Sequence, residues 1–223
     1  MMTVEQAITG RQSIRGYLDK AVPREVLERV LLTAGRAPSG SNIQPWRVYV
    51  LQGAVKQSLS DEILALNKAG VEGKREYNYY PVEWRDPYLA RRRKTGWGLY
   101  GLLGLGRDDK AGMTDQHRQN YTFFGAPVGL IFTIDRDMEL GSWLDTGMFL
   151  QSLMIAARGE GLETCAQAAF CQYHDVIQQR LKIPAGQQVV CGMALGYADP
   201  ASKINGFRTE RMPLSEFVTW ADE

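Results

Sequence analysis

Two arginines and a serine lie within five residues of one another in "RQSIRGY", Arg11 to Tyr17. They follow Gly10, which is a helix-stop signal. If the segment is extended, Arg11, Ser13 and Arg15 project to one side, because side chains alternate along a strand. Two guanidinium groups and a hydroxyl on one side form a plausible phosphate receptor. A solvated basic edge strand is the alternative interpretation.

Two further arginines, Arg208 and Arg211, stand near the other end of the chain in "NGFRTERMP". They are candidates to complete the same receptor, although a solvated tail also fits them. Each charge-assisted hydrogen bond contributes about 1.5–3 kcal/mol. Three or four such bonds supply only part of the roughly 8–12 kcal/mol behind micromolar to nanomolar affinity. The rest of the ligand must therefore be bound by other residues.

The stretch "RAPSGSNIQPW", Arg36 to Trp46, is the third candidate. It contains two prolines and a run of small polar residues, and it joins a helical pattern to a strand pattern. Most helix-to-strand connections need only about two to six residues. The length and stiffness of this turn exceed what a simple connection requires.

Other kinds of site find little support in the sequence. There is no GxxxxGK[ST] motif and no G-x-S-x-G, and the glycine-rich "GLYGLLGLG" lacks the acidic partner of a dinucleotide-binding fold. Two histidines and three cysteines (Cys165, Cys171 and Cys191) show no metal-ligand spacing, so we predict buried thiols and no metal site.

Length and composition favour one domain over residues 1–223 of a cytoplasmic protein. Hydrophobic residues make up 44% and charged residues 23%, and the net charge is +1. This balance does not favour nucleic acid or a membrane surface as a partner. We see neither a signal peptide nor an apolar run of about 18 residues, the length that a membrane span needs.

Hydrophobic periodicity predicts the elements that carry these residues. Residues 70–118 are rich in aromatic residues, arginine and glycine, and we expect an irregular or partly helical excursion that covers a ligand. The apolar helix predicted over 142–161 is expected to be buried, for example at a subunit interface. The mixture of elements indicates an α+β sandwich around one central sheet. The periodicity predicts helices over 4–9, 23–37, 54–69, 142–161 and 174–181, and strands over 47–51, 126–134 and 188–198.

These segments, in this order, resemble the nitroreductase family of flavin mononucleotide (FMN) flavoproteins. "RQSIRGY" is similar to the family's R-x-S-x-R opening, and "APSGSNIQPWRVYV" is similar to its A-P-S-x-x-N-x-Q-P-W pattern. "FFGAPVGLIF", "GMALGYADP" and "RMPLSEF" also resemble the family. The resemblance runs from Arg11 to Phe217, and residues 70–118 diverge most.

The resemblance implies a nitroreductase-like α/β sandwich with a central mixed, mainly antiparallel sheet flanked by helices. It also implies an intertwined homodimer, in which residues 200–223 extend onto the partner subunit and 70–118 form a lid. FMN would be the cofactor, NAD(P)H the electron donor, and a small aromatic molecule the acceptor.

The resemblance also assigns cofactor-binding residues. Arg11, Ser13 and Arg15 would contact the phosphate, ribityl chain and pyrimidine edge, with Gln12 contributing mainly backbone. Main-chain amides in "ETCAQAAF" would donate toward flavin N5, but many relatives carry glycine late in this stretch, so the donor stays open. No catalytic side chain is implied. The other implied contacts are Arg211 and the nearby Arg208 at the phosphate, Pro38, Ser39 and Asn42 from the partner subunit, and Ala166, Gln167 and Ala168 near N5.

The implied function is NAD(P)H-dependent reduction of nitroaromatic or related electron-poor acceptors by a ping-pong hydride-transfer mechanism. One of Arg91, Arg92 and Arg93 in the lid is a candidate contact for a nitro or carboxylate group, with a solvated arginine run as the alternative. A dehalogenase-like relative, a flavin-fragmenting relative and a non-catalytic flavin-binding module are alternative functions. For the deiodinase-like branch, the lid residues Glu72, Lys74, Glu76 and Tyr77 give only a faint similarity.

Overall fold

The computed structural model describes residues 2–221. Residue 1 of the predicted domain and residues 222–223 of the predicted C-terminal extension lie outside the described residues. The helices and strands are α1 (Val4–Gly10), α2 (Arg24–Ala34), β1 (Trp46–Leu51), α3 (Gly53–Lys68), α4 (Tyr88–Leu102), α5 (Lys110–Arg118), β2 (Val128–Asp135), α6 (Leu140–Gly159), β3 (Glu163–Gln167), α7 (His174–Leu181) and β4 (Gln187–Gly196).

The strands form one antiparallel sheet in the order β1-β2-β4-β3. Its register places Trp46 opposite Ile134, and Ala166 opposite Met193. An isolated parallel bridge between Ser13 and Thr164 attaches the N-terminal arm to β3. The predicted α+β architecture with a mainly antiparallel central sheet is therefore confirmed.

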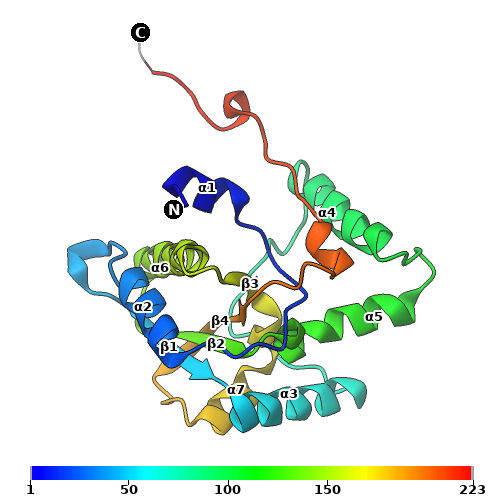
Figure 1. Cartoon of the computed structure of the whole chain (residues 1–223), viewed down its shortest axis with the longest axis horizontal. Helices are drawn as coiled ribbons and strands as arrows, with labels where there is room; N and C mark the ends of the chain where they lie inside the picture. The colour runs from blue at the N-terminus through cyan, green and yellow to red at the C-terminus, as the bar shows by residue number, and fades with distance from the viewer. Residues whose placement is uncertain (1, 222–223) are drawn as a thin grey trace.

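Helices cover both faces of the sheet, because its central strand is apolar on both sides. Phe132 of β2 packs toward α2 and α6, whereas the adjacent Ile131 packs with residues of α3 and α7. Figure 1 shows α2 and α6 on one side of the strands and α3 and α7 on the other. This arrangement explains why β2 reads as an unbroken apolar run and not as an alternating one.

Two glycines make room for an aromatic pair on one face of the sheet. A Cβ on Gly129 of β2 would lie 2.6 Å from the Phe123 ring, and a Cβ on Gly192 of β4 would strike the Phe170 ring. The two rings stack with centroids 4.5 Å apart and an interplanar angle of 27°. Phe170 belongs to a short 3-10 helix that directly follows β3, so this pair fixes how that segment sits on the sheet.

Helix α6 differs from the expectation of burial around its whole circumference. Phe149 and Leu153 are buried in the core, as an apolar helix requires. Leu140 and Leu144, however, are 84% and 69% exposed in the single chain. The apolar composition of this helix therefore comes from two faces, only one of which packs on the sheet.

The excursion over residues 70–118 contains two helices, α4 and α5. Its first residues, 71–77, are hydrogen-bonded to the core. The Tyr77 hydroxyl donates to the carbonyl oxygen of Val190 in β4. The Tyr173 hydroxyl donates to the carbonyl oxygen of Val71 over 3.2 Å. Further along the chain, every residue of α4 is at least partly exposed. The role of this segment as a lid stays a prediction.

Candidate cofactor site

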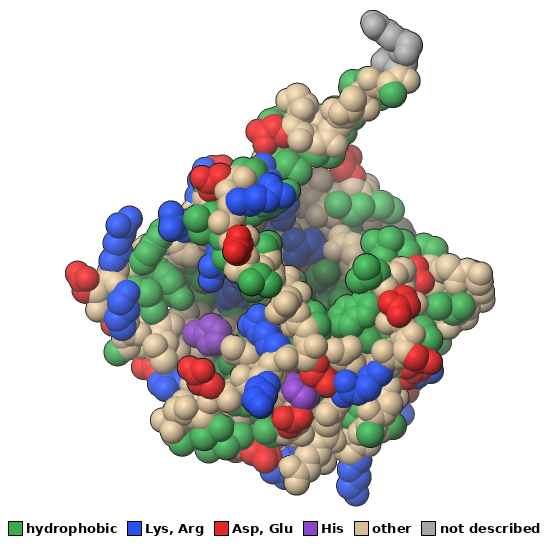
Figure 2. All heavy atoms as spheres, turned by 180° about the vertical axis from the view of Figure 1, so that it is seen from behind, with side chains coloured by type: hydrophobic (Ala, Val, Ile, Leu, Met, Phe, Trp, Pro, Cys, Tyr) green, Lys and Arg blue, Asp and Glu red, His purple; other side chains and the backbone are tan. Residues whose placement is uncertain are grey.

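The arginines from the two ends of the chain line one cavity. Six of the residues predicted to bind the cofactor lie around this cavity, whose volume is about 440 Å³. Figure 2 shows Lys and Arg atoms gathered in a recess at the base of the projecting C-terminal segment. The structure therefore brings together the segment around Arg11 and the segment around Arg208 and Arg211. These six residues are Arg11, Gln12, Ser13, Arg15, Arg208 and Arg211.

The N-terminal arm of this cavity is held against β3. Ile14 is only 2% exposed, and its amide donates to the carbonyl oxygen of Thr164 over 3.0 Å. With Ile14 directed into the core, Ser13 and Arg15 on either side of it are left to line the cavity. A buried apolar residue in the middle of the motif thus fixes the orientation of its polar neighbours.

Asn205 joins the C-terminal segment to this arm. Its Oδ1 accepts a hydrogen bond from the Arg15 amide over 2.9 Å, and its Nδ2 donates to the Gly16 carbonyl oxygen over 2.8 Å. Gln12 Nε2 donates to the Asn205 carbonyl oxygen over 2.9 Å. The sequence analysis assigned no role to Asn205, and its position before a glycine in "NGF" was the only signal available. Asn205 thus holds the N-terminal arm and the C-terminal segment together in the wall of the cavity.

The cavity is electropositive, and it lies beside a half-buried ion pair. Burial lowers the pKa of the Arg11 guanidinium from its ordinary value, and the nearby Arg211 lowers it further. Arg158 Nη1 and Glu163 Oε1 form an ion pair of 3.0 Å. Burial raises the pKa of Glu163, while Arg158 and Arg11 act in the opposite direction. Cations that are partly desolvated and close together favour an anionic ligand between them.

Ala166, Gln167 and Ala168 lie where β3 ends and the following 3-10 helix begins. Ala166 and Gln167 belong to the same strand as Thr164, to which the arginine arm is bonded. Gln167 is buried, its Nε2 donates to the Asn120 carbonyl oxygen over 2.7 Å, and its Oε1 finds no partner within the described chain. Which main-chain amide here meets a ligand stays a prediction.

Pro38, Ser39 and Asn42 are not among the residues that line this cavity in the single chain, within the described part. They belong to a turn in which Ser41, Asn42 and Gln44 adopt positive φ angles of 48°, 59° and 50°. Non-glycine residues rarely adopt this conformation, which costs energy. The predicted stiffness of the turn is therefore present, and its predicted contact across a subunit interface stays a proposal.

The strained turn is fixed by a buried carboxylate that the sequence analysis missed. Asp145 of α6 is 7% exposed, and its Oδ2 accepts a hydrogen bond from the Gly40 amide over 3.1 Å. The Ser39 hydroxyl oxygen accepts a second bond, from the Gln44 amide over 3.0 Å. The turn is thus held in shape by its own chain, which suits a preorganised binding element.

Two other kinds of site are absent from residues 2–221. No group of three His, Cys, Asp or Glu side chains in this part of the chain is arranged to hold a metal ion. None of its helices is both long enough and apolar enough to cross a membrane. Cys165, Cys171 and Cys191 are free and buried, as predicted.

Comparison with known proteins identifies the family. The model of the nitroreductase family matches residues 8–197. A 4-nitrobenzoate reductase from Nocardioides sp. (strain LMS-CY) is 42% identical over 97% of this chain and 90% of its own length. A chloronitrobenzene nitroreductase from Comamonas testosteroni is 38% identical over 99% of this chain and 97% of its own length. The chain therefore belongs to the nitroreductase family.

A solved structure agrees with this assignment. The crystal structure of the FMN and NADPH-dependent nitroreductase NfnB from Sphingopyxis sp. strain HMH has a TM-score of 0.96 to this chain. It is 36% identical in sequence and covers 99% of this chain and 100% of its own. The predicted nitroreductase-like fold is confirmed by this similarity.

Proposed function

We propose that this protein is an FMN-dependent, NAD(P)H-oxidising nitroreductase that reduces nitroaromatic acceptors by a ping-pong mechanism. The observation that carries the proposal is the arginine-lined cavity, in which residues from both ends of the chain meet. Relatives that match nearly the whole chain are a 4-nitrobenzoate reductase and a chloronitrobenzene nitroreductase. A structural neighbour with the same fold is FMN and NADPH-dependent.

The residues around the cavity fit FMN. Arg11, Arg208 and Arg211, with the hydroxyl of Ser13, offer charged and neutral donors for a phosphate dianion. Gln12 Oε1 is buried and finds no partner within the described chain. Buried polar atoms need hydrogen-bond partners, and a hydroxyl of the ribityl chain would satisfy this acceptor. We propose that these residues bind the cofactor.

When bound, FMN would supply the hydride and electron chemistry, which explains why no catalytic side chain is required. The chain's own residues would bind, orient and tune it. Arg15 would place a cation beside the cofactor's pyrimidine edge, where reduction accumulates negative charge. The unpaired edge of β3 at residues 166–168 would direct main-chain amides toward the ring.

The dehalogenase alternative is not favoured by the geometry. Its residues would have to converge on a zwitterionic amino acid. Instead, the Tyr77 hydroxyl bonds to Val190 in the core, and Glu76 forms an ion pair of 2.6 Å with Arg136. Glu72 and Lys74 are exposed. The four residues therefore have separate structural surroundings.

The proposed reaction is tested by mixing the purified yellow protein anaerobically with NADPH or NADH alone. We expect the flavin absorbance to bleach before any acceptor is added, because donor and acceptor take turns in a ping-pong mechanism. Adding nitrobenzene should then restore the oxidised spectrum. A yellow protein that neither nicotinamide bleaches would contradict the proposal and support a non-catalytic flavin-binding module.

We further propose that the chain forms a homodimer, with the C-terminal segment extended onto its partner. Phe217 and Trp220 are 58% and 74% exposed, and the segment runs away from its own domain (Figure 1). Leu140 and Leu144 add an exposed apolar stripe on α6. Exposed apolar surface of this kind is typical of an interface. A partner would also bring the turn that carries Ser39 and Asn42 to the cofactor.

The dimer is tested by the double substitution Leu140→Glu with Leu144→Glu. Two carboxylates on the stripe should oppose association, because burying a charge without a partner is costly. We expect a monomer in light scattering after size exclusion, with reduced FMN content. The paired control is Lys68→Glu on α3. A double variant that stays dimeric with full FMN would place the interface elsewhere.

A further inference from the structure

A second cavity, beside helix α4, is lined mainly by aromatic and arginine side chains. Its volume is about 450 Å³, and Tyr80, Trp84 and Tyr88 form aromatic walls. The rings of Tyr80 and Trp84 have centroids 5.4 Å apart and are tilted by 40°. Aromatic walls at such angles pack well on the faces and edges of an aromatic ligand. Arg91, Arg92 and Thr95 of α4 complete the lining.

The structure separates the roles of the three consecutive arginines on α4. The guanidinium of Arg92 lies 4.6 Å from the centroid of the Trp84 ring, so it forms part of the aromatic wall. Arg93 is exposed, and it is not among the lining residues of this cavity in the described chain. Within residues 2–221, Arg91 alone of the three carries an ion pair, since its Nη2 donates to Glu216 Oε2 over 3.0 Å. Arg91 is therefore already bound to a carboxylate.

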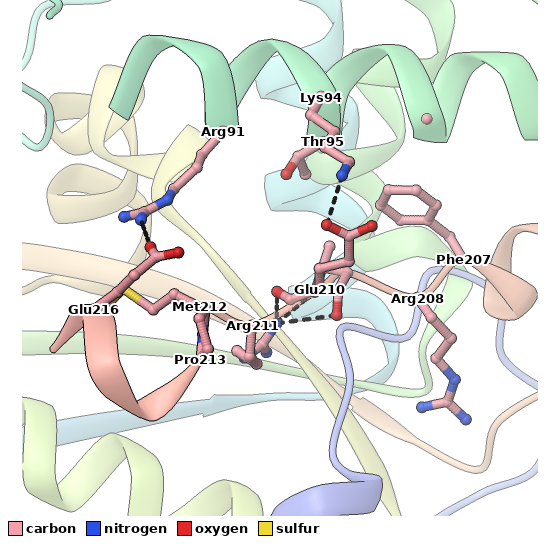
Figure 3. A pocket seen from close by; sticks show the side chains of 12 residues that line it. Arg91, Lys94, Thr95, Phe207, Arg208, Glu210, Arg211, Met212, Pro213 and Glu216 are labelled. Carbon is pink, nitrogen blue, oxygen red and sulfur yellow. Dashed lines mark hydrogen bonds and ion pairs between the residues drawn. The ribbon is translucent and has the colours of Figure 1, made fainter. Parts of the chain in front are cut away.

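That carboxylate can be exchanged. Figure 3 shows Arg91 and Lys94 reaching from α4 toward Glu216 and Glu210 of the C-terminal segment. The side chains of Arg91 and Glu216 are 46% and 51% exposed, and ion pairs as exposed as this one contribute little to stability. A guanidinium also binds any planar carboxylate in a bidentate manner. Arg91 lines both the aromatic cavity and the neighbouring cavity that contains Glu216, so a ligand carboxylate in the aromatic cavity would compete with Glu216 for this guanidinium.

The aromatic cavity adjoins the proposed cofactor site. Thr95 lies one helical turn after Arg91, and it lines both this cavity and the one that contains Arg11. A ligand held by Arg91 would therefore lie next to the arginine-lined cavity. An aromatic acid bound by its carboxylate would keep the opposite end of its ring free for the reaction.

We infer that Arg91 is a specificity-determining residue that selects nitroaromatic carboxylates, such as 4-nitrobenzoate, over neutral nitroaromatics. This inference rests on the proposed nitroreductase function. The carboxylate of the substrate displaces Glu216 from Arg91, and the ring packs against the wall formed by Tyr80 and Trp84. The nitro group, on the opposite side of the ring, faces the cofactor.

The test measures binding and turnover separately in Arg91→Gln. Binding of 4-nitrobenzoate to the oxidised, FMN-loaded protein is followed by calorimetry without nicotinamide, so that no reaction occurs. We expect the Kd to rise about tenfold or more, as for the loss of a charge-assisted hydrogen bond. The KM for 4-nitrobenzoate should rise similarly, while kcat/KM for nitrobenzene changes less than about threefold.

The control variants distinguish charge selection from damage to the lid. Arg93→Gln removes the same charge two residues away and should leave the Kd and both kcat/KM values unchanged. Arg91→Lys should recover part of the 4-nitrobenzoate binding, and Glu216→Gln should lower its Kd by removing the competing carboxylate. An unchanged Kd in Arg91→Gln, or an equal loss with nitrobenzene, would overturn the inference. If wild-type protein reduces neither compound, the proposed function fails, and the calorimetry still decides whether Arg91 binds the carboxylate.

Discussion

Replacing Arg11 and Arg211 together by alanine is expected to give folded but colourless protein. Both side chains line the cavity proposed for the FMN phosphate, and each lies near the other. A charge-assisted hydrogen bond contributes about 1.5–3 kcal/mol, so losing two should weaken FMN binding by about 10²- to 10⁴-fold. The measurement is the ratio of flavin absorbance to protein after purification, followed by titration of the apoprotein with FMN.

A control for this variant removes two surface arginines instead. Arg24 and Arg29 pair with Glu28 and Glu160 on the surface, with side chains 88% and 53% exposed. The double variant Arg24→Ala with Arg29→Ala should keep its full FMN content. If the Arg11 and Arg211 variant also keeps stoichiometric FMN, the phosphate site has been assigned to the wrong residues. Circular dichroism of the colourless protein separates lost binding from lost folding.

Phe149→Ala is expected to destabilise the fold strongly. Phe149 is 2% exposed, and its ring stacks on Trp46 with centroids 4.8 Å apart and an interplanar angle of 11°. It also meets the edge of Phe132, whose centroid is 6.3 Å away. Truncating a buried phenylalanine to alanine costs about 3–5 kcal/mol, because apolar burial is lost and a cavity remains.

That cost is a large part of the roughly 5–15 kcal/mol by which a typical domain is stable. We expect a lower midpoint in urea denaturation with an unchanged m-value, measured at fixed protein and FMN concentrations. Leu32→Ala, on an α2 residue that is 74% exposed, should change the free energy of unfolding by no more than about 0.5 kcal/mol. Equal losses in both variants would mean that Phe149 is not a central core residue.

Much of the fold was predictable because most elements follow a clear hydrophobic period. The predicted helix over 174–181 coincides with α7, and the predicted strand over 47–51 is β1 without its first residue. The strand β3 was missed because "ETCAQ" is short and does not alternate. Within 70–118 the helix α4 could not be defined, since it contains three glycines and buries no residue within its bounds. A periodic pattern needs a buried face to produce it.

The residues of the candidate site were likewise predictable from the sequence only in part. The two arginine segments could be recognised because chemistry constrains their residue types, and the structure brings them together. Asn205 and Asp145 act by bonding to backbone groups far away in sequence, over 2.9 Å at the Arg15 amide and 3.1 Å at the Gly40 amide. Such contacts leave no spacing pattern in the chain. The contacts of the predicted residues with FMN itself stay predictions.

The stacked pair of Phe123 and Phe170 over Gly129 and Gly192 has a consequence for engineering this enzyme. A methyl group on either glycine would displace the ring that packs against it. At Gly192 the displaced ring is Phe170, so the 3-10 helix that follows β3 would shift as well. This face of the sheet thus has no tolerance for added volume. Libraries that seek new acceptors should therefore vary the exposed cover around α4 and leave these strands untouched.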